Sequence, residues 1–248
     1  MKKRLLTFTI ACMVLAIAWY FYYFRLLLTF MISILGIIEW QKCLRRQGVG
    51  IIFWPIMVCL LFVSAIYYDL ISCFYMAVLA LVVNMCFSIV VLFLGRLQWV
   101  LHLSIVPWLL ITPIFFTDII NDASLFVSLL LVAGGFDSWS LLFGRWFGQT
   151  LIAPSISPNK TFEGVIGGLL WVCVFQLFFF NSVTAALLGV AISLACLLSD
   201  LYASAFKRFC QVKDFSNLMP GHGGIMDRFD SLLLGVPAYY LLYLNWAG

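Results

Sequence analysis

Long apolar runs follow one another along almost the whole chain, and they restrict its fold more than any other feature. A helix that crosses a bilayer needs about 20 mostly apolar residues. We identify nine candidate spans, at approximately 5–23, 26–40, 51–68, 71–94, 98–116, 124–143, 164–180, 183–202 and 231–247. The chain is 65% hydrophobic and only 10% charged, whereas soluble domains are about half apolar and a quarter charged. The sequence therefore predicts an all-α polytopic membrane protein.

The basic residues predict how these spans are oriented. With a cytoplasmic N-terminus, alternate loops hold all of the 14 Lys and Arg residues except Arg25, in agreement with the positive-inside rule. This layout places the polar loops 144–163 and 203–230 together on the cytoplasmic side. We expect a multi-pass protein of the cell membrane, which is the inner membrane if the source is bacterial. The apolar run that follows Lys2 is expected to be a retained span and not a cleaved signal peptide.

Polar motifs are confined to the second part of the chain. Residues 1–96 are expected to form N-terminal transmembrane helices, and residues 97–248 a transmembrane catalytic region. The net charge of +4 gives no argument for binding nucleic acid. The eight cysteines contain no C-x-x-C pair, and most fall in apolar runs, where cysteine behaves as a small hydrophobe. A homodimer is compatible with the sequence.

An aspartate interrupts the apolar run GGFDSWSLLFGRWFGQ. Charged residues inside membrane helices are costly, and they usually face a bundle interior or an aqueous cavity. Asp137 is therefore a candidate site residue, although it also suits a carboxylate that is hydrogen-bonded to a neighbouring helix. Arg145 lies eight residues further on, on about the same helix face, and it is either a topology anchor or a phosphate contact.

The sequence SPNKTFEG, at 157–164, is typical of a helix start. Thr161 or Ser157 can cap the helix, and Glu163 then lies in its first turn, where the helix dipole favours an acidic residue. Backbone N–H groups at such a start, together with Lys160, can receive a phosphate. The alternative is a plain helix cap beside a lysine that only sets topology. Gly167 and Gly168 are expected to let two helices approach closely.

A third group of polar residues follows the span at 183–202. If that helix continues, Asp200, Ser204 and Lys207 share one face, because they are spaced i, i+4 and i+7. A carboxylate, a hydroxyl and an ammonium would then line one stripe at the membrane boundary. The alternative is a capping aspartate followed by basic residues that snorkel to the interface.

A glycine-rich turn, PGHGG at 220–224, precedes two aspartates. Its glycines allow the backbone to approach a ligand and to aim N–H groups at phosphate oxygens. Asp227 and Asp230 are spaced i, i+3 on the helix that is expected to begin after the turn. Mg²⁺ commonly takes one or two carboxylates together with substrate phosphates. His222 is a candidate base or phosphate donor, or else a hydrogen-bonded turn residue. Together these motifs favour phosphoryl or nucleotidyl transfer to a lipid without selecting the reaction.

The segment 204–230 resembles the signature of the phosphatidate cytidylyltransferases, also called CDP-diacylglycerol synthases. The positions that match are Ser204, Lys207, Arg208, Lys213, Asp214, Ser216, Pro220, His222, Gly223, Gly224, Asp227, Arg228 and Asp230. SPNKTFEG and Asp137 with Gly144–Arg145 are also similar to the family, so the resemblance covers about residues 130–248. The chain departs from the family at three positions. Met219 replaces the usual Leu, Ile or Phe, Ala203 stands where many members have glutamate, and Ser199 where many have glycine.

The resemblance implies a membrane enzyme that converts CTP and phosphatidate to CDP-diacylglycerol and pyrophosphate. It also implies Mg²⁺ as cofactor, with K⁺ as a possible companion. The implied metal ligands are Asp200, Asp227 and Asp230. The implied catalytic residues are Asp200, Lys207, Asp214, Asp227 and Lys160. Substrate contacts are implied for Ser204, Arg208, Lys213, His222, Gly223, Gly224, Arg228, Asp137 and Arg145.

Two other classes of function stay open. One is a CTP-dependent kinase that acts on a polyprenol-type lipid. The other is a non-enzymatic anion transporter, which the sequence disfavours because transporters place charges near the midplane and are built from repeated halves. Here the charged residues gather toward one predicted surface, and the two halves of the chain differ.

Overall fold

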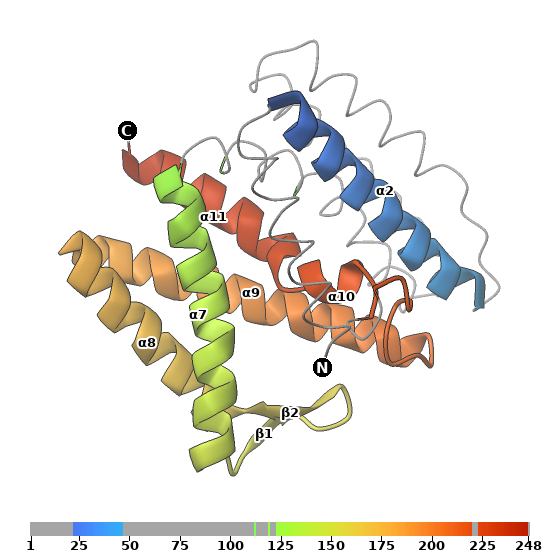
Figure 1. Ribbon diagram of the computed structural model, residues 1–248. Helices are drawn as coiled ribbons and strands as arrows, with labels where there is room; N and C mark the ends of the chain where they lie inside the picture. The colour runs from blue at the N-terminus through green and yellow to red at the C-terminus, as the bar shows by residue number, and fades with distance from the viewer. Residues whose placement is uncertain (1–21, 47–111, 113–118, 120–122, 220–222, 248) are drawn as a thin grey trace, which may run out of the picture. The chain divides into compact units, whose positions relative to one another are not determined.

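The computed structural model describes residues 22–46, 112, 119, 123–219 and 223–247. In chain order its elements are α2 (Tyr22–Arg46), α7 (Ala123–Phe147), β1 (Leu151–Ala153), β2 (Ser157–Thr161), α8 (Phe162–Phe180), α9 (Val183–Phe209), α10 (Met226–Phe229) and α11 (Leu232–Ala247) (Figure 1). The chain divides into two compact units. Unit 1 consists of Met1–Asp118 and Val212–Arg228, and unit 2 of Ile119–Gln211 and Phe229–Gly248.

Three helices of the described part are long and apolar enough to cross a membrane. They are Ser124–Phe147, Phe162–Phe180 and Val183–Phe209, and a shorter apolar helix covers Leu232–Leu242. The mostly helical, membrane-type fold is therefore confirmed. The predicted spans 5–23, 51–68, 71–94 and 98–116 lie almost entirely outside the described residues, as does the predicted boundary at 96–97. The number of nine spans and their orientation stay predictions.

Unit 2 is built around α7, α8 and α9. In Figure 1, α8 and α9 form an antiparallel hairpin and α7 crosses them. Asn181 turns the chain between α8 and α9 in the left-handed conformation, with φ 46°, and Ser182 caps α9 by accepting a bond from the Ala185 N–H. The buried side chains between these helices include Leu129, Val132, Phe136, Val172 and Ile192.

Glycines on α8 bring that helix close to α7, as the sequence predicted. A Cβ atom at Gly168 would lie 2.8 Å from the Phe136 carbonyl oxygen, and one at Gly164 would lie 3.1 Å from the Gly144 Cα. Since any side chain here would push the helices apart, the small residues set their spacing. The ends of α7 and α8 that carry the polar motifs are thereby held together.

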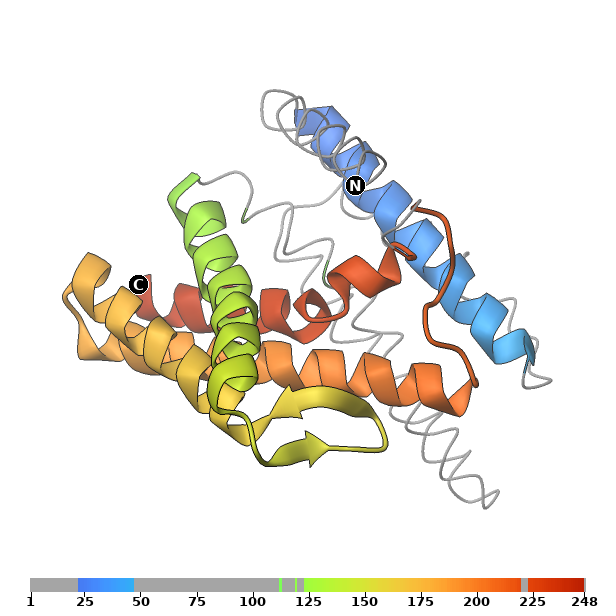
Figure 2. The ribbon, with the colours of Figure 1, turned by 60° about the horizontal axis from the view of Figure 1, so that its bottom comes forward.

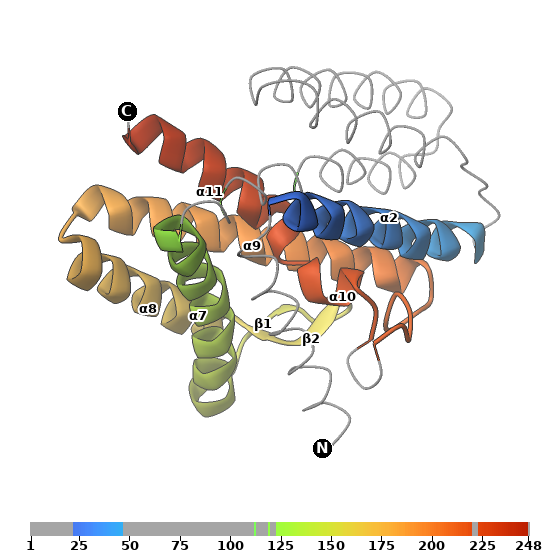
Figure 3. The same cartoon turned by 45° about the horizontal axis from the view of Figure 1, so that its top comes forward.

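The helix α9 continues to Phe209, well past the predicted end of its span at residue 202. Its continuation confirms that Asp200, Ser204 and Lys207 lie on one helix. Figure 3 shows α11 running back along α9. The fully buried Ser199 joins the two elements, because its hydroxyl donates to the Asp230 carbonyl oxygen and accepts from the Leu234 N–H at 3.3 Å.

A short antiparallel hairpin adds two strands to the predicted all-α architecture. Leu151 pairs with Thr161 and Ala153 with Ser157, with an irregularity between these pairs. In Figure 2 the hairpin extends from the ends of α7 and α8 alongside α9. The Glu163 carboxylate stabilises its base by accepting from the Gln149 and Thr150 N–H groups, at 3.1 Å and 3.2 Å. Strands this short have no alternating apolar pattern, so they could not be predicted from the sequence.

Unit 1 is described in α2 and in two stretches of the loop 212–228. The α2 helix includes the predicted span 26–40 but continues to Arg46, so its last basic residues are helical and not in a loop. Its buried face carries Trp40, whose ring stacks on Phe215 with centroids 5.5 Å apart. This contact, between residues far apart in sequence, fixes the loop on the end of the helix.

Candidate functional site

A large hollow in unit 2 lies where α7, β2 and α9 meet. It has a volume of about 1290 Å³, counting the space that is open to its surroundings. Its lining includes four of the residues predicted from the sequence, which are Asp137, Arg145, Lys160 and Asp200. Because these residues come from three separate elements, the fold brings together motifs that are up to 63 positions apart in the chain.

An ion pair between Lys160 and Asp200 crosses this hollow. Lys160 is on β2 and Asp200 is on α9, and their side chains are 23% and 22% exposed. The Thr161 hydroxyl caps α8 by accepting from the Gly164 N–H at 3.2 Å, so the residue after Lys160 is fixed at the helix start. The predicted cap is thereby confirmed. The ammonium of Lys160 therefore pairs with a carboxylate and is not simply exposed to solvent.

The polar stripe on α9 continues from Asp200 to Lys207. The Ser204 hydroxyl donates to the Asp200 carboxylate at 3.4 Å, and the Lys207 ammonium lies 3.5 Å from the Asp230 carboxylate. The three residues thus lie on one helix as predicted, and Ser204 interacts with Asp200, while Lys207 pairs with a residue outside α9. Ala203 is fully buried and is not part of the lining of the hollow.

Asp137 lines the hollow from α7 and is exposed to it. Its carboxylate is within electrostatic range of Lys160 and Asp200. One ammonium therefore faces two carboxylates in this part of the site. Ser140, one turn further along α7, lines the same hollow, and its buried hydroxyl has no hydrogen-bond partner among the described residues. The sequence analysis missed Ser140, although its i+3 spacing from Asp137 places it on the same face.

Arg208 lies further along α9. Its Nε donates to the Ile156 carbonyl oxygen at 3.3 Å, which ties the turn of the β-hairpin to the last turn of α9. A structural role for this predicted substrate contact is therefore visible. Arg145 is on the last turn of α7 and not in the following loop, and it is exposed at the edge of the hollow.

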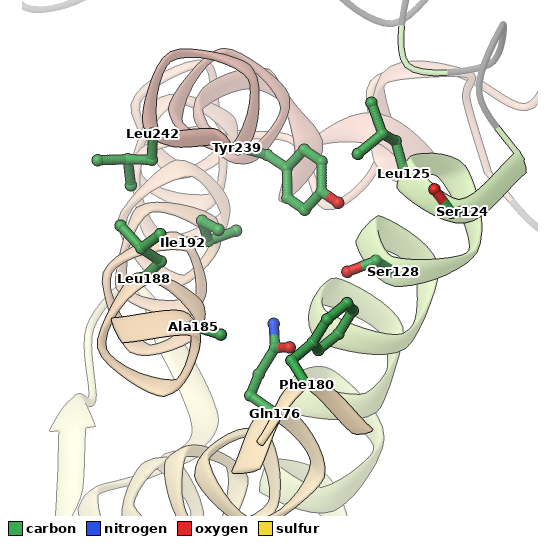
Figure 4. Close-up of a pocket in the computed structure, with 10 residues that line it drawn as sticks. All are labelled: Ser124, Leu125, Ser128, Gln176, Phe180, Ala185, Leu188, Ile192, Tyr239 and Leu242. Atoms are coloured by element: carbon green, nitrogen blue, oxygen red, sulfur yellow. The ribbon is translucent and has the colours of Figure 1, made fainter. Parts of the chain in front are cut away.

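A second, smaller hollow in the same unit has a different character (Figure 4). Its lining is Ser124, Leu125, Ser128, Gln176, Phe180, Ala185, Leu188, Ile192, Tyr239 and Leu242. These residues come from the start of α7, the end of α8, the first part of α9 and from α11, so this hollow lies toward the other end of α7 and α9 from Asp137 and Asp200. It contains no charged side chain and is therefore not suited to phosphates.

The predicted residues 212–228 belong to unit 1, where Asp227 organises its own loop. The Asp227 Oδ2 accepts from the Phe215 N–H and the Gly224 N–H, both at 2.9 Å. Gly223 has φ +82°, a conformation that glycine adopts without strain. His222 lies outside the described residues. The predicted helix after the turn is only α10, which ends at Phe229, so Asp230 follows it.

Glu39 on α2 holds the same loop, and the sequence analysis missed it. Its side chain is 2% exposed. Its carboxylate accepts from the Ser216 hydroxyl at 2.5 Å, the Ile225 N–H at 3.0 Å and the Met226 N–H at 2.9 Å. The signal was available, because an acidic residue in the apolar run LGIIEWQ calls for the same argument that selected Asp137.

The remaining predicted residues are exposed. Lys213 and Asp214 line a hollow beside the end of α2, and Arg228 is exposed on α10. Unit 1 thus holds Lys213, Asp214, Asp227 and Arg228, while unit 2 holds the site around Asp200.

Comparison with known proteins identifies the family. The sequence profile of the cytidylyltransferase family matches residues 2–246. The uncharacterized protein YnbB of Escherichia coli K12 is 35% identical over 155 residues, which are 60% of this chain and 51% of that protein. The phosphatidate cytidylyltransferase of Haemophilus influenzae is 41% identical over 130 residues (48% and 44%), and that of Staphylococcus aureus strain COL is 45% identical over 116 residues (44% and 45%). The chain spans about half the length of the curated relatives it matches. Because the profile match covers almost all of it, the chain belongs to the cytidylyltransferase family.

Proposed function

We propose that this protein transfers CMP from CTP to phosphatidate, which gives CDP-diacylglycerol and pyrophosphate. The observation that carries the proposal is the hollow where α7, β2 and α9 meet, in which the Lys160–Asp200 ion pair lies beside Asp137 in a bundle of membrane-type helices. Such a site offers cations to phosphates within a bundle of apolar helices. The names of the relatives from Haemophilus and Staphylococcus support the same reaction.

The proposed reaction requires little proton transfer by the protein. A phosphate monoester has a second pKa of about 6, so the lipid phosphate is largely ionised at neutral pH and needs no strong base. One of its oxygens attacks the α-phosphorus of CTP, and the bond from that phosphorus to the departing pyrophosphate breaks. The protein must hold two anions together and offset their charge.

Lys160 is well placed for this task. Its ammonium now pairs with the Asp200 carboxylate, and a phosphate that enters the hollow would compete for the same ammonium. Ser140, whose hydroxyl has no partner among the described residues, offers one further donor from α7. Further along α9, the ammonium of Lys207 pairs with the Asp230 carboxylate. Lys207 therefore supplies a second ammonium group.

Magnesium is part of the proposal. Among the described residues, no three His, Cys, Asp or Glu side chains are grouped so as to hold a metal ion by themselves. Mg²⁺, however, commonly binds through one or two carboxylates together with substrate phosphates, and Asp200 and Asp230 in unit 2 supply such carboxylates. Asp227 stays a metal ligand that the family resemblance implies. When bound, the ion would neutralise charge on phosphate oxygens. A companion K⁺ belongs to the same proposal.

The membrane and the side on which the site lies are also proposed. The apolar helices α7, α8 and α9 fit an integral membrane protein. The basic residues of the sequence favour a site that faces the cytoplasm, where CTP is available. For a bacterial source this is the inner membrane.

One assay tests the reaction directly. The full chain is purified in detergent and incubated with CTP, phosphatidate and Mg²⁺, in parallel samples labelled at the α- or the γ-phosphate. We expect label from the α-phosphate in the lipid and label from the γ-phosphate in pyrophosphate. Lipid labelled only from the γ-phosphate would instead establish a lipid kinase. If no labelled lipid forms, the same protein reconstituted into vesicles would be established as a transporter by exchange of CTP across them.

A further inference from the structure

A hollow in unit 1 lies between the last two turns of α2 and the stretch Val212–Asn217. It has a volume of about 820 Å³, counting space open to its surroundings. Its lining is Lys42, Cys43, Arg46, Val212, Lys213, Asp214, Phe215, Ser216 and Asn217. The two walls are about 170 positions apart in the chain, so the hollow is a product of the fold.

The charges around this hollow are unbalanced. Lys42, Arg46 and Lys213 line it together with a single carboxylate, that of Asp214. Within the described part of the chain, none of the three cations forms an ion pair. Like charges around one concave surface repel one another and raise the local concentration of anions. A bound anion would relieve this repulsion.

Helix geometry selects two of the three basic residues at the end of α2. Lys42 and Arg46 are spaced i, i+4 and therefore share a face. Arg45 lies on the same turn and is equally exposed, but it is not part of the lining. A role in topology or in the helix dipole would apply to all three residues, whereas a binding role applies only to Lys42 and Arg46.

The walls of the hollow are held rigidly. Phe215 is buried, stacks on Trp40 at 5.5 Å and has its carbonyl oxygen 4.0 Å from the Cys43 Sγ. Glu39 fixes the same loop through Ser216. Lys42 and Arg46 thus line the same hollow as Lys213. The turn of α2 that precedes Arg46 is packed against the loop. A fixed backbone lowers the entropic cost of bringing these three side chains together around an anion.

We propose that Lys42, Arg46 and Lys213 form a phosphate-binding subsite of this protein. An arginine fork suits two phosphate oxygens, and a lysine supplies a compact charge. The subsite rests on the proposed function for the source of its phosphate, which is either the triphosphate of CTP or the headgroup of phosphatidate. Lys42 and Arg46 belong to the first part of the chain, for which the sequence predicted transmembrane helices and no site residue.

Binding measured without turnover tests this subsite. Equilibrium dialysis of labelled CTP in the absence of phosphatidate measures one source. Co-purification of labelled phosphatidate with the protein in nanodiscs, in the absence of CTP, measures the other. We expect the Lys42→Ala/Arg46→Ala double variant to bind one of the two ligands at least about tenfold more weakly, because it loses two charged phosphate contacts. The Arg45→Ala variant is expected to stay within about twofold of the native chain.

A charge-conserving variant separates binding from folding. Lys42→Arg/Arg46→Lys is expected to recover most of the affinity, and all variants should elute as the native chain does in size-exclusion chromatography. Unchanged affinity of the double alanine variant for both ligands would overturn the subsite, and so would an equal loss in Arg45→Ala. A different observation would overturn the proposed function. The native chain would then form no CDP-lipid, whatever the binding experiments give.

Discussion

The buried carboxylate of Glu39 gives the sharpest prediction about the first part of the chain. Replacing Glu39 with alanine removes the acceptor for the Ser216 hydroxyl and for the Ile225 and Met226 N–H groups. Gly224 packs directly on this carboxylate, since a Cβ atom there would lie 2.6 Å from Glu39 Oε2. The variant therefore leaves both a gap and unpaired donors under the loop that carries Asp227.

The size of the effect follows from the bonds that are lost. A buried donor left without a partner costs about 1–3 kcal/mol, and two backbone N–H groups lose their acceptor. Local opening of residues 223–228 should become more favourable by about 2–6 kcal/mol. A change of about 1.4 kcal/mol is tenfold in an equilibrium constant, so amide exchange at Ile225 and Met226 should accelerate by at least about tenfold.

The conservative variant Glu39→Gln gives a residue-specific pattern. An amide keeps one acceptor oxygen, and the orientation that retains the bonds of Oε1 to Ser216 and Ile225 turns its NH₂ group toward the Met226 N–H. Met226 should then lose more protection than Ile225. Glu163→Gln is a matched control, because Glu163 also accepts from two backbone N–H groups, but at the β-hairpin.

Hydrogen exchange followed by mass spectrometry, with CMP transfer assayed on the same samples, measures both consequences. We expect Glu39→Ala to lose exchange protection and transfer activity together, and Glu163→Gln to leave exchange at Ile225 and Met226 unchanged. Native exchange rates at these amides in Glu39→Ala would refute the reasoning, whatever the activity does.

Three further predictions concern unit 2 and the loop aspartate. Lys160→Ala removes the partner of Asp200. It should raise the KM of CMP transfer and leave the Tm of thermal unfolding close to the native value. Unchanged KM and kcat would make Lys160 a topology anchor. Asp227→Asn should abolish CTP-dependent pyrophosphate release while the protein still elutes as native, and near-normal turnover would contradict the metal role. Gly168→Ala should lower the unfolding free energy by about 1–3 kcal/mol, because its Cβ would lie 2.8 Å from the Phe136 carbonyl oxygen; Gly134→Ala, which has nothing within 4 Å, is the control.

The sequence was sufficient to predict those structural features for which a residue pattern has only one physical outcome. Apolar length predicted α7, α8 and α9, and the i, i+4, i+7 spacing of Asp200, Ser204 and Lys207 predicted that they share α9, which its continuation to Phe209 confirms. The cap at Thr161 was predicted as one of two choices. These features depend on interactions between residues that are close together in the chain, so a sequence pattern is enough to predict them.

Features that depend on distant partners could not be predicted in the same way. The β-hairpin depends on Glu163 reaching back to Gln149 and Thr150. Pairing of Lys160 with Asp200 joins residues 40 positions apart. Glu39 reaches a loop at the other end of the sequence. No periodicity encodes such contacts, although an acidic residue in an apolar run marks where one partner must be.

Asp227 shows why loss of activity alone does not identify a metal ligand. Its Oδ2 accepts from the Phe215 and Gly224 N–H groups, so the side chain shapes the loop whether or not it binds magnesium. In Asp227→Asn the amide oxygen can keep both backbone bonds while the negative charge is lost. If the charge is what matters, protection of the Phe215 and Gly224 amides should stay native while transfer is lost. If the loop is what matters, protection and transfer should fall together, and the metal role would then pass to Asp200 and Asp230.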